Sequence, residues 1–390
     1  MRRLAIVVQR YGREVGGGAE SHARWVAQRL RGRFEVTVYT STALDYVTWE
    51  NHYAPGTEEF DGALVRRFPV EGGRDLELFN RYSRWIFAEP HRDADEERWL
   101  LLQGPVVPGL VEALRRDRTA HDIFLFFTYL YYPTVKGVAE VGRRAVLYPT
   151  AHDEPPIRLR LYRRLFAAPA AFMLNTEVER RFLERLFDLG HRPRVVVGMG
   201  IDWPEPDPDP APTLERLGIG RPYALSFGRL TAGKGHDLVV KSFVDSPVDL
   251  DLVLFGTLEM ELPDDPRVRH LGFISDEEKW AVIAGARFTV HPSPYESLSL
   301  ALLESWAVGV PALVNAECAV LADHIERCGG GLAYRGGDDF VRQVEAFGAD
   351  EERGGRMGEA GRGYVRSRYA AAEVADRYAE FLDRMIELRS

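Results

Sequence analysis

Two glutamates, Glu296 and Glu304, lie eight residues apart in the stretch 291–311. A short apolar run ends where this stretch begins, two prolines interrupt it, and a helical composition follows as far as Gly309. The pattern predicts a strand, a turn and then a helix over 298–308. Glu296 would stand in the turn, and Glu304 about two helical turns further on. Carboxylate oxygens in such positions accept the hydrogen bonds that sugar hydroxyls donate.

The amino end of this predicted helix also suits an anion. Backbone N–H groups in a first helical turn lack partners inside the helix and carry the positive end of its dipole. We therefore expect Leu298, Ser299 and Leu300 to hold a phosphate group. The alternative is a surface helix whose spaced glutamates serve only to keep it solvated.

The loop 228–236 is a second candidate for binding phosphate. A strand predicted at 224–227 precedes it, so Arg229 and Lys234 stand at the carboxyl end of a strand. Arginine offers a planar fork of donors and lysine a point charge, which together suit a diphosphate. The loop lacks the spacing of a Walker motif and the Ser or Thr that follows its lysine. Simple surface charge is the alternative.

Three consecutive glycines, Gly16, Gly17 and Gly18, separate a strand predicted at 4–8 from a helix that extends to about residue 30. Glycine lets the backbone approach a ligand closely and leaves N–H groups facing it. A dinucleotide site is disfavoured, because no acidic residue follows the next predicted strand to hold a ribose. We expect the glycines to contact a ligand, with a plain flexible turn as the alternative.

Further polar and aromatic residues follow other predicted strands of the first half. His152 and Asp153 come after a strand at 145–147 and before a proline break, where a core role explains a histidine poorly. A hydrogen-bonded loop histidine is the alternative. Ligands bind at the carboxyl ends of strands in open α/β sheets. The remaining candidates for binding an acceptor are Gln103, Tyr129 and Tyr131.

The composition is that of a large globular protein. A chain of 390 residues exceeds one ordinary core, so two domains are expected. The net charge of -9 argues against nucleic acid as a partner. The two cysteines have no metal-ligand spacing, and no Asp-x-Asp pair stands out as a metal site. We therefore expect a reaction that needs neither a metal nor a cofactor.

The expected location is the cytoplasm. The amino-terminal apolar run is too short for a signal peptide, and no run approaches ~18 apolar residues. A helix expected at 157–166 places Arg160, Arg163 and Arg164 on one face. This helix would either touch the inner face of a membrane peripherally or pack with its apolar face inward as an ordinary domain helix.

The segment 204–213 is acidic and rich in proline, as expected of a stiff linker. It divides the chain into a first domain at 1–203 and a second at 214–370. An amphipathic pattern at 371–390 predicts a final helix.

The order of these motifs resembles the GT4 family of retaining, nucleotide-sugar-dependent glycosyltransferases. The glycine loop ending in Glu20, the His-Asp pair, a Gly-x-Asp at 200–202, the Arg/Lys loop and the Glu-x7-Glu pair follow one another as in that family. Three positions in two of the motifs differ, because the family commonly has Asn at Gly198 and Phe-Gly at 298–299. Ser299 stands where the family has the glycine of this pair. Its side chain would either narrow the access of a ligand to the backbone or offer its hydroxyl to the ligand as a donor.

This resemblance implies the α/β GT-B fold, with two Rossmann-like domains facing each other across a cleft and a last helix that crosses back to the first. The first domain would bind the acceptor and the second the nucleotide sugar. Within the second domain, Phe273 and Ile274 would contact the nucleobase through their backbone, Glu304 the ribose and Glu296 the transferred sugar. His152 would lie near that sugar.

The expected activity is retaining transfer of a sugar from a UDP- or GDP-sugar to a hydroxyl of a sugar, lipid-linked or small-molecule acceptor. Polysaccharide, glycolipid or glycoconjugate biosynthesis would use such a reaction. His152, Arg229, Lys234 and Glu296 would be its catalytic residues. An epimerase resembling UDP-GlcNAc 2-epimerase and a non-catalytic nucleotide-sugar-binding homologue are the alternatives. The sequence leaves open the base, the sugar, the acceptor and the oligomeric state.

Overall fold

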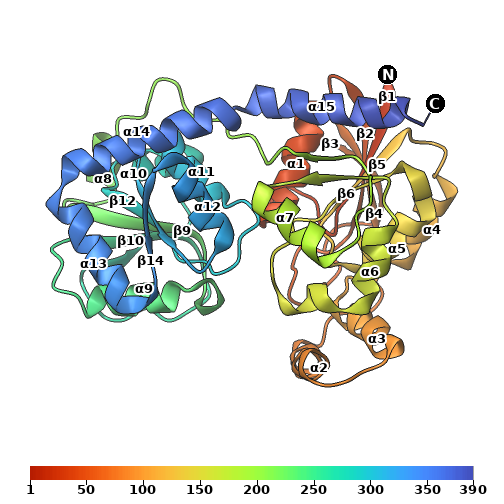
Figure 1. The fold of residues 1–390 in the computed structure, drawn as a ribbon, viewed down its shortest axis with the longest axis horizontal. Coiled ribbons are helices and arrows are strands. Elements are labelled where there is room, and N and C mark those ends of the chain that lie inside the picture. Colours follow the sequence, from red (N-terminus) through yellow and green to blue (C-terminus); the bar gives the residue numbers. More distant parts are fainter. Residues whose placement is uncertain (390) are drawn as a thin grey trace. The chain divides into compact units, whose positions relative to one another are not determined.

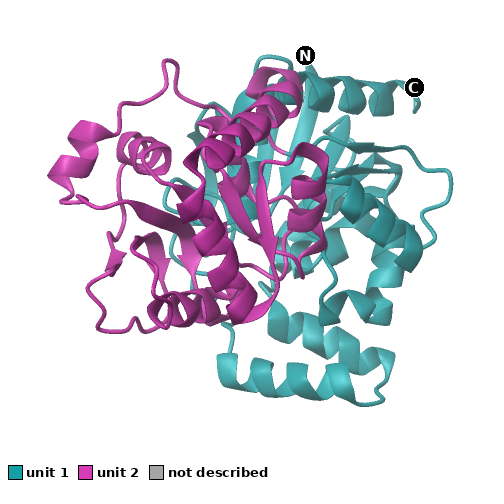
Figure 2. Ribbon diagram, turned by 60° about the vertical axis from the view of Figure 1, so that its left-hand side comes forward, with its two compact units in different colours: residues 1–198, 374–390 teal, residues 199–373 magenta. Residues whose placement is uncertain are grey.

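The computed structural model describes residues 1–389, which form two compact α/β units (Figures 1 and 2). Unit 1 comprises Met1–Gly198 and Val374–Ser390, and unit 2 comprises Met199–Glu373. The expected α/β class with two parallel-sheet domains is confirmed.

The chain passes from unit 1 to unit 2 directly after Gly198, whereas the sequence placed the end of the first domain at residue 203. The proline-rich segment 204–213 lies within unit 2. Its last residues are not extended linker but part of a helix, α8 (Ala211–Arg216).

The sheet of unit 1 is parallel apart from one edge. Its strands are β1 (Arg2–Val7), β2 (Phe34–Ser41), β3 (Gly56–Phe60), β4 (Ala63–Phe68), β5 (Ile123–Phe127), β6 (Ala145–Tyr148), β7 (Ala171–Leu174) and β8 (Arg194–Val196). They pair in the order β3-β4-β2-β1-β5-β6-β7-β8, and only β3 and β4 run antiparallel. The order reverses between β1 and β5, and open α/β sheets bind ligands beside such a reversal.

Seven helices precede the unit boundary, and an eighth returns from the end of the chain. They are α1 (Gly18–Leu30), α2 (Leu76–Ala88), α3 (Asp93–Gln103), α4 (Pro108–Arg116), α5 (Tyr132–Val141), α6 (Arg160–Ala167), α7 (Glu177–Leu186) and α15 (Ala371–Glu387). Helices α2 and α3 form a hairpin at one end of unit 1, away from the sheet (Figure 1).

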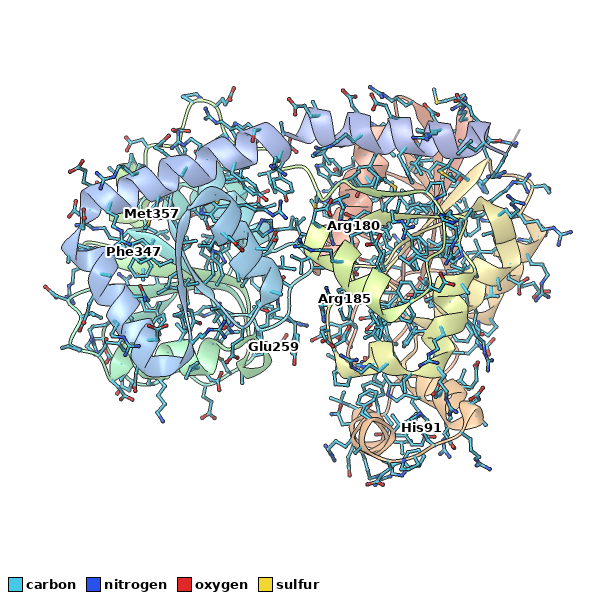
Figure 3. The ribbon with its side chains drawn as sticks, in the orientation of Figure 1. His91, Arg180, Arg185, Glu259, Phe347 and Met357 are labelled. Carbon is cyan, nitrogen blue, oxygen red and sulfur yellow. The ribbon has the colours of Figure 1, made fainter. Side chains whose placement is uncertain are left out.

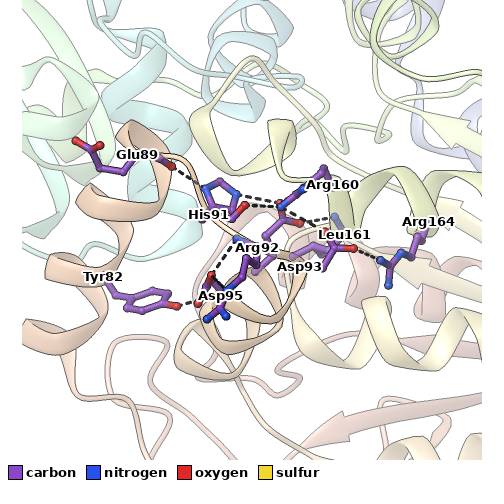
Figure 4. Close-up of polar contacts among 10 residues, drawn as sticks. Tyr82, Glu89, His91, Arg92, Asp93, Asp95, Arg160, Leu161 and Arg164 are labelled. Carbon is purple, nitrogen blue, oxygen red and sulfur yellow. Dashed lines mark hydrogen bonds and ion pairs between the residues drawn. The ribbon is translucent and has the colours of Figure 1, made fainter.

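Helix α6 packs as an ordinary domain helix. Leu161 and Phe166 are buried in the core of unit 1. Arg160 lies 3.0 Å from Glu96, and both Arg160 and Arg164 pair with Asp93 (Figure 4). Two of the three arginines that suggested a membrane-facing surface are therefore neutralised by acids of α3.

The sheet of unit 2 is parallel throughout. Its strands are β9 (Tyr223–Leu230), β10 (Asp251–Leu258), β11 (Val268–His270), β12 (Phe288–His291), β13 (Ala312–Asn315) and β14 (Gly331–Tyr334). They pair in the order β11-β10-β9-β12-β13-β14. This is the strand order of a Rossmann fold, in which the crevice for the ligand opens where the order reverses, here between β9 and β12.

Helices cover both faces of this sheet. They are α9 (His236–Val244), α10 (Asp276–Ala284), α11 (Leu300–Ala307), α12 (Ala319–Cys328), α13 (Gly336–Ala349) and α14 (Glu351–Arg368), together with α8. Leu252 and Leu254 of β10 belong to the cluster under α9 and α13, whereas Val253 between them packs with α10. Because successive side chains point to opposite faces, both faces need apolar residues, which explains the continuous apolar strands.

Aromatic packing fixes α13 to the sheet. The ring of Phe347 in α13 stacks on Phe288 of β12 with 4.7 Å between centroids. Met357 of α14 packs against the same cluster, next to Phe347 (Figure 3).

The carboxyl-terminal helix α15 completes unit 1. Tyr378 is fully buried, and its hydroxyl lies 2.7 Å from Nε2 of His22 in α1. The same hydroxyl donates to the carbonyl of Gly198 at 3.0 Å. At the far end of the helix, Arg2 pairs with Glu387 at 2.9 Å.

Burial of His22 makes the contact between α1 and α15 sensitive to acid. Burial lowers the pKa of His22 from 6.5 to about 3. Between about pH 3 and 6.5, His22 therefore binds a proton in the unfolded chain but not in the folded protein. The stability that the neutral His22 contributes is complete above pH 6.5 and falls as the pH is lowered towards 3.

We predict that His22→Gln, which can still bond to Tyr378, makes the melting temperature depend less on pH between about 7.5 and 5 than in the wild type. His191→Gln, at an exposed position, is the control and should keep the wild-type dependence. Equal pH dependence in the wild type and in His22→Gln would contradict the prediction.

Candidate functional site

The reversal of strand order in unit 2 brings two predicted motifs together. Arg229 is the last residue but one of β9, and the loop after it leads into α9. β12 is the neighbour of β9, and the loop that follows it carries Glu296 and leads into α11. The two loops therefore meet at the carboxyl edge of the sheet, where ligands bind in folds of this kind.

An ion pair joins these loops. Nζ of Lys234 lies 2.9 Å from Oε1 of Glu296, with the lysine side chain 34% exposed and the glutamate 19%. An ammonium group has three N–H donors and a carboxylate has two oxygens, so the pair leaves polar capacity on both partners. Being half-exposed, the pair adds little to stability, about 0–1 kcal/mol. Its placement suits ligand binding better than folding.

Gly235 allows the loops to approach. Its φ of +79° lies in the left-handed region. A Cβ at this position would lie 2.7 Å from the carbonyl oxygen of Pro292, closer than side chains tolerate. Only glycine therefore fits where the Lys234 loop crosses the Glu296 loop.

Two neutral histidines lie beneath the ion pair. His291 ends β12, and burial lowers its pKa to about 3. His236 begins α9, and burial lowers its pKa to about 4. Neither imidazole is protonated at neutral pH, so the positive charge of this region comes from Arg229, which is exposed, and Lys234.

The helix after Glu296 starts later than the sequence indicated. Ser299 has φ +70°, a left-handed conformation, and α11 begins at Leu300. The first backbone bond of the turn runs from Leu303 N–H to the Ser299 carbonyl at 3.3 Å. The prediction that Leu298, Ser299 and Leu300 all belong to the first turn is therefore wrong for the first two. The N–H groups of the first turn of α11 come from Leu300 and the next two residues.

Lys279, which the sequence analysis did not assign, pairs with the second glutamate. Its Nζ, on α10, lies 3.0 Å from Oε1 of Glu304 on α11, and each side chain is 22% exposed. The two glutamates of the Glu-x7-Glu motif thus each hold a lysine. No short motif contains Lys279, since twenty-five residues separate it from Glu304. Its only signal was that lysine is rare in this chain.

The two residues expected beside the nucleobase have different surroundings. Phe273 is 82% exposed. Ile274 is partly buried against the cluster under α10. Both follow β11, and the short loop also contains Gly272, whose carbonyl accepts a bond from Gly256 N–H at 2.9 Å.

In unit 1, a buried ion pair supports the glycine loop. Arg10 and Glu20 are 5% and 7% exposed, and their charged groups lie 2.6 Å apart. Arg10 also donates to the carbonyl of Gly16 at 2.9 Å. Gly17 has φ +141°, and a Cβ there would lie 2.3 Å from Glu20. Gly16 and Gly18 have open space on that side, as access for a ligand requires.

The His152 loop follows β6 and is tied to the Tyr129 loop after β5. Tyr129 donates its hydroxyl to Oε1 of Glu154 at 2.6 Å. Nδ1 of His152 lies 3.7 Å from the same oxygen. The histidine side chain is 27% exposed, whereas Tyr129 is 1% exposed and burial raises the pKa of its phenol. Glu154 therefore links two of the predicted residues, a role that the sequence analysis missed.

Two of the remaining acceptor candidates, Gln103 and Tyr131, both contact Trp49, whereas Asp153 has another partner. Gln103 is 6% exposed, and its carbonyl accepts the indole N–H of Trp49 at 2.8 Å. The ring of Tyr131 contacts Trp49 edge-on at 5.5 Å. Asp153 is exposed and pairs with Arg158 at 2.5 Å. Of the four acceptor candidates, Gln103 and Tyr129 are buried, Tyr131 is partly buried and Asp153 is exposed.

Within residues 1–389, no three His, Cys, Asp or Glu side chains are grouped so as to hold a metal ion. Independence of metals stays a prediction. The same residues include no helix that combines the length and apolarity needed to span a bilayer.

We predict that Ser299→Gly leaves stability unchanged or raises it. A left-handed non-glycine residue costs about 1–2 kcal/mol, which exceeds the roughly 0.5–1 kcal/mol of extra chain entropy that glycine loses on folding. Ser293→Gly is the matched control, because this buried serine of the same loop donates to the Tyr295 carbonyl at 2.9 Å. It should lose about 1 kcal/mol. Urea unfolding measures both, and the opposite ranking would contradict the strain at Ser299.

Residues 215–364, the greater part of unit 2, match the family of glycosyl transferases group 1. A curated relative is 31% identical over 142 residues, which are 34% of this chain and 35% of that protein. It is the N-acetylgalactosamine-N,N'-diacetylbacillosaminyl-diphospho-undecaprenol 4-alpha-N-acetylgalactosaminyltransferase of Campylobacter jejuni. The match thus spans about a third of the relative's length.

Two solved structures match almost the whole chain. Sucrose-phosphate synthase from Thermosynechococcus elongatus has a TM-score of 0.73 at 17% identity and covers 100% of both chains. Anabaena HepE in complex with UDP has a TM-score of 0.72 at 14% identity, over 98% of this chain and 100% of its own. Residues 215–364 are thus similar to the group 1 glycosyl transferases, and the chain has the GT-B fold.

Proposed function

We propose that this protein is a retaining glycosyltransferase that moves a hexose-type sugar from a nucleoside diphosphate sugar to an acceptor hydroxyl. The ion pair between Lys234 and Glu296, formed where the strand order of unit 2 reverses, carries this proposal. A donor of N–H bonds suits the diphosphate, and an acceptor beside it suits the hydroxyls of the sugar.

The ion pair has a different task when the donor is bound. Without a ligand, Glu296 neutralises Lys234 at 2.9 Å. A diphosphate would take up the remaining N–H donors of Lys234, while the second oxygen of Glu296 accepts a sugar hydroxyl. The bond between the sugar and the diphosphate, which the reaction breaks, would thereby lie between the ammonium group of Lys234 and the carboxylate of Glu296.

Charge that develops on the leaving diphosphate needs preorganised donors. Arg229 and Lys234 supply two cations, and the first-turn N–H groups of α11 supply the positive end of a helix dipole. Removal of one such group typically lowers the rate by on the order of 10² to 10³.

The stereochemistry follows from which acids are available. A retaining hydrolase uses two carboxyl groups about 5–5.5 Å apart, one of them as nucleophile. Glu296 is instead paired with Lys234. We therefore infer attack from the face that the diphosphate leaves, with the leaving phosphate taking the acceptor's proton. On the family resemblance, His152 orients the transferred sugar.

Several relatives guide the choice of ligands to test. HepE is solved with UDP and with UDP-glucose, which favours a UDP-sugar over a GDP-sugar as the first donor to try. The name of the Campylobacter relative describes a diphospho-undecaprenol acceptor. We therefore rank a lipid-linked acceptor first, with a sugar or small molecule as alternatives. A cytoplasmic enzyme in peripheral contact with the inner membrane face would reach such a lipid.

We predict that one of UDP, GDP and ADP raises the melting temperature. A ligand specific for the folded state adds ~2.7 kcal/mol at a hundredfold excess over its dissociation constant. Lys234→Ala and Glu304→Ala should abolish the shift, whereas Lys241→Ala, at an exposed position on α9, should keep it. If no nucleotide shifts the folded wild type, the donor site is wrongly assigned.

We predict retention of the anomeric configuration. Proton NMR of the product formed from an α-linked UDP-sugar should show an α-linkage before any equilibration. A β-linked product would disprove the retaining mechanism. Conversion of the donor to a free epimerised sugar without any acceptor would instead indicate an epimerase, and a nucleotide sugar that is bound but stays intact would indicate a binding protein.

A further inference from the structure

A buried carboxyl group holds the backbone of the His152 loop. Glu179, in the first turn of α7, is 1% exposed. Its Oε1 accepts the N–H of Ala151 at 2.6 Å, and its Oε2 accepts the N–H of Asn175 at 2.7 Å. Ala151 directly precedes His152, so one of these bonds fixes the peptide between Thr150 and Ala151, one residue before the histidine.

Such a group is costly to bury. Desolvation outweighs the two N–H bonds and raises the pKa of Glu179 to about 8. Its neighbour Arg180, labelled on α7 in Figure 3, pairs instead with Glu177 and Glu184, at 2.6 and 2.7 Å. An apolar side chain would fill the space at a lower desolvation cost, but it cannot accept two backbone N–H groups.

The loop that Glu179 holds is strained. Thr150 has φ +50°, a left-handed conformation that is rare for a β-branched residue. Such a conformation costs on the order of 1–3 kcal/mol and persists only where the surroundings enforce it. Glu179 binds the very next N–H, and on the other side Tyr129 N–H donates to the carbonyl of Pro149 at 3.1 Å.

The second bond connects this loop to its neighbour. Asn175 follows β7, and its side-chain oxygen accepts the hydroxyl of Tyr148 from the end of β6 at 2.7 Å. Glu179 and this bond therefore tie together the carboxyl ends of β6 and β7. The His152 loop leaves the sheet from that point.

We propose that Glu179 is a positioning residue, which holds the strained loop 149–153 and thereby sets the place of His152. Its effect on catalysis rests on the proposed function, whereas its effect on the loop does not. Glu179 acts through His152 and touches no substrate.

The test compares Glu179→Gln with Glu96→Gln. Glu96 is also 1% exposed and accepts a backbone N–H, that of Leu161 at 2.7 Å, but it joins α3 to α6. Glutamine keeps the shape of each side chain and turns one acceptor oxygen into a donor. If both glutamates were only structural, both variants would lose stability without a specific change at His152.

The first readout needs no enzymatic activity. Among the ten histidines, labelled with ¹³C at Cε1, the NMR signal of His152 is the one that His152→Gln removes. Glu179→Gln should shift this signal, and Glu96→Gln should leave it in place. An unchanged His152 signal in Glu179→Gln, or an equal shift in both variants, would overturn the proposal.

The second readout is turnover of the nucleotide sugar that the binding screen identifies. Glu179→Gln should lower kcat by on the order of 10², the effect expected when a catalytic group is displaced by about 1 Å, with KM for the donor unchanged. In a His152→Ala background, Glu179→Gln should lower kcat no further. A full additional loss in that background would show that Glu179 does not act through His152.

Two other outcomes, a variant that does not fold and a wild type without activity, still leave a decisive test. If Glu179→Gln does not fold, Glu179→Asp, which keeps the carboxyl group but withdraws it by one methylene group, takes its place in both readouts. If the wild type turns over no nucleotide sugar, the proposed function fails, and the NMR comparison still decides whether Glu179 positions His152.

Discussion

The close crossing of two loops at Gly235 and Pro292 is the constraint on which the predicted donor site depends. A Cβ at Gly235 would lie 2.7 Å from the Pro292 carbonyl, so any other residue would separate the loops. With the loops together, Lys234 reaches Glu296, and a cation and an acceptor share one edge of the sheet. The pairing of β9 with β12 brings the two loops to the same edge of the sheet. The absence of a side chain at Gly235 lets them approach closely enough for the ion pair to form.

In unit 1 the requirement is different, because the glycine loop and the His152 loop need to be held in one conformation rather than brought close together. Buried ionisable side chains do this work: Arg10 and Glu20 brace the glycine loop, and Glu179 braces the loop of His152. Buried ionic groups are weak stabilisers, since desolvation offsets much of their attraction. Their bonds to backbone groups instead select one loop conformation. Both braces lie at the carboxyl edge of the sheet, where α/β folds place their ligands.

The sequence predicted the strands that carry the site loops, the two-sheet class and the order of the motifs, because continuous apolar runs and glycine-bearing loops are local signals. It did not predict the edge strand β3. It placed α11 two residues early, since Ser299 adopts a backbone conformation that residue type alone does not indicate. It also missed Lys279, Glu154 and Glu179. Each of these acts on a residue distant in sequence or through the backbone, so spacing gave no sign of it. Lone polar residues within helices, such as Glu179, look like ordinary surface positions until burial is known.

The position of α15 has a consequence for synthesis. Unit 1 needs Val374–Ser390, yet the ribosome makes all of unit 2 first. At roughly 5–20 residues per second, the buried hydroxyl of Tyr378 follows the carbonyl of Gly198 by about 10–40 s. During that interval the Tyr378 hydroxyl that bonds to His22 and to Gly198 has not yet been made, whereas unit 2 is one continuous segment of the chain. The residues of unit 2 are therefore all synthesised before the part of the final helix that unit 1 needs.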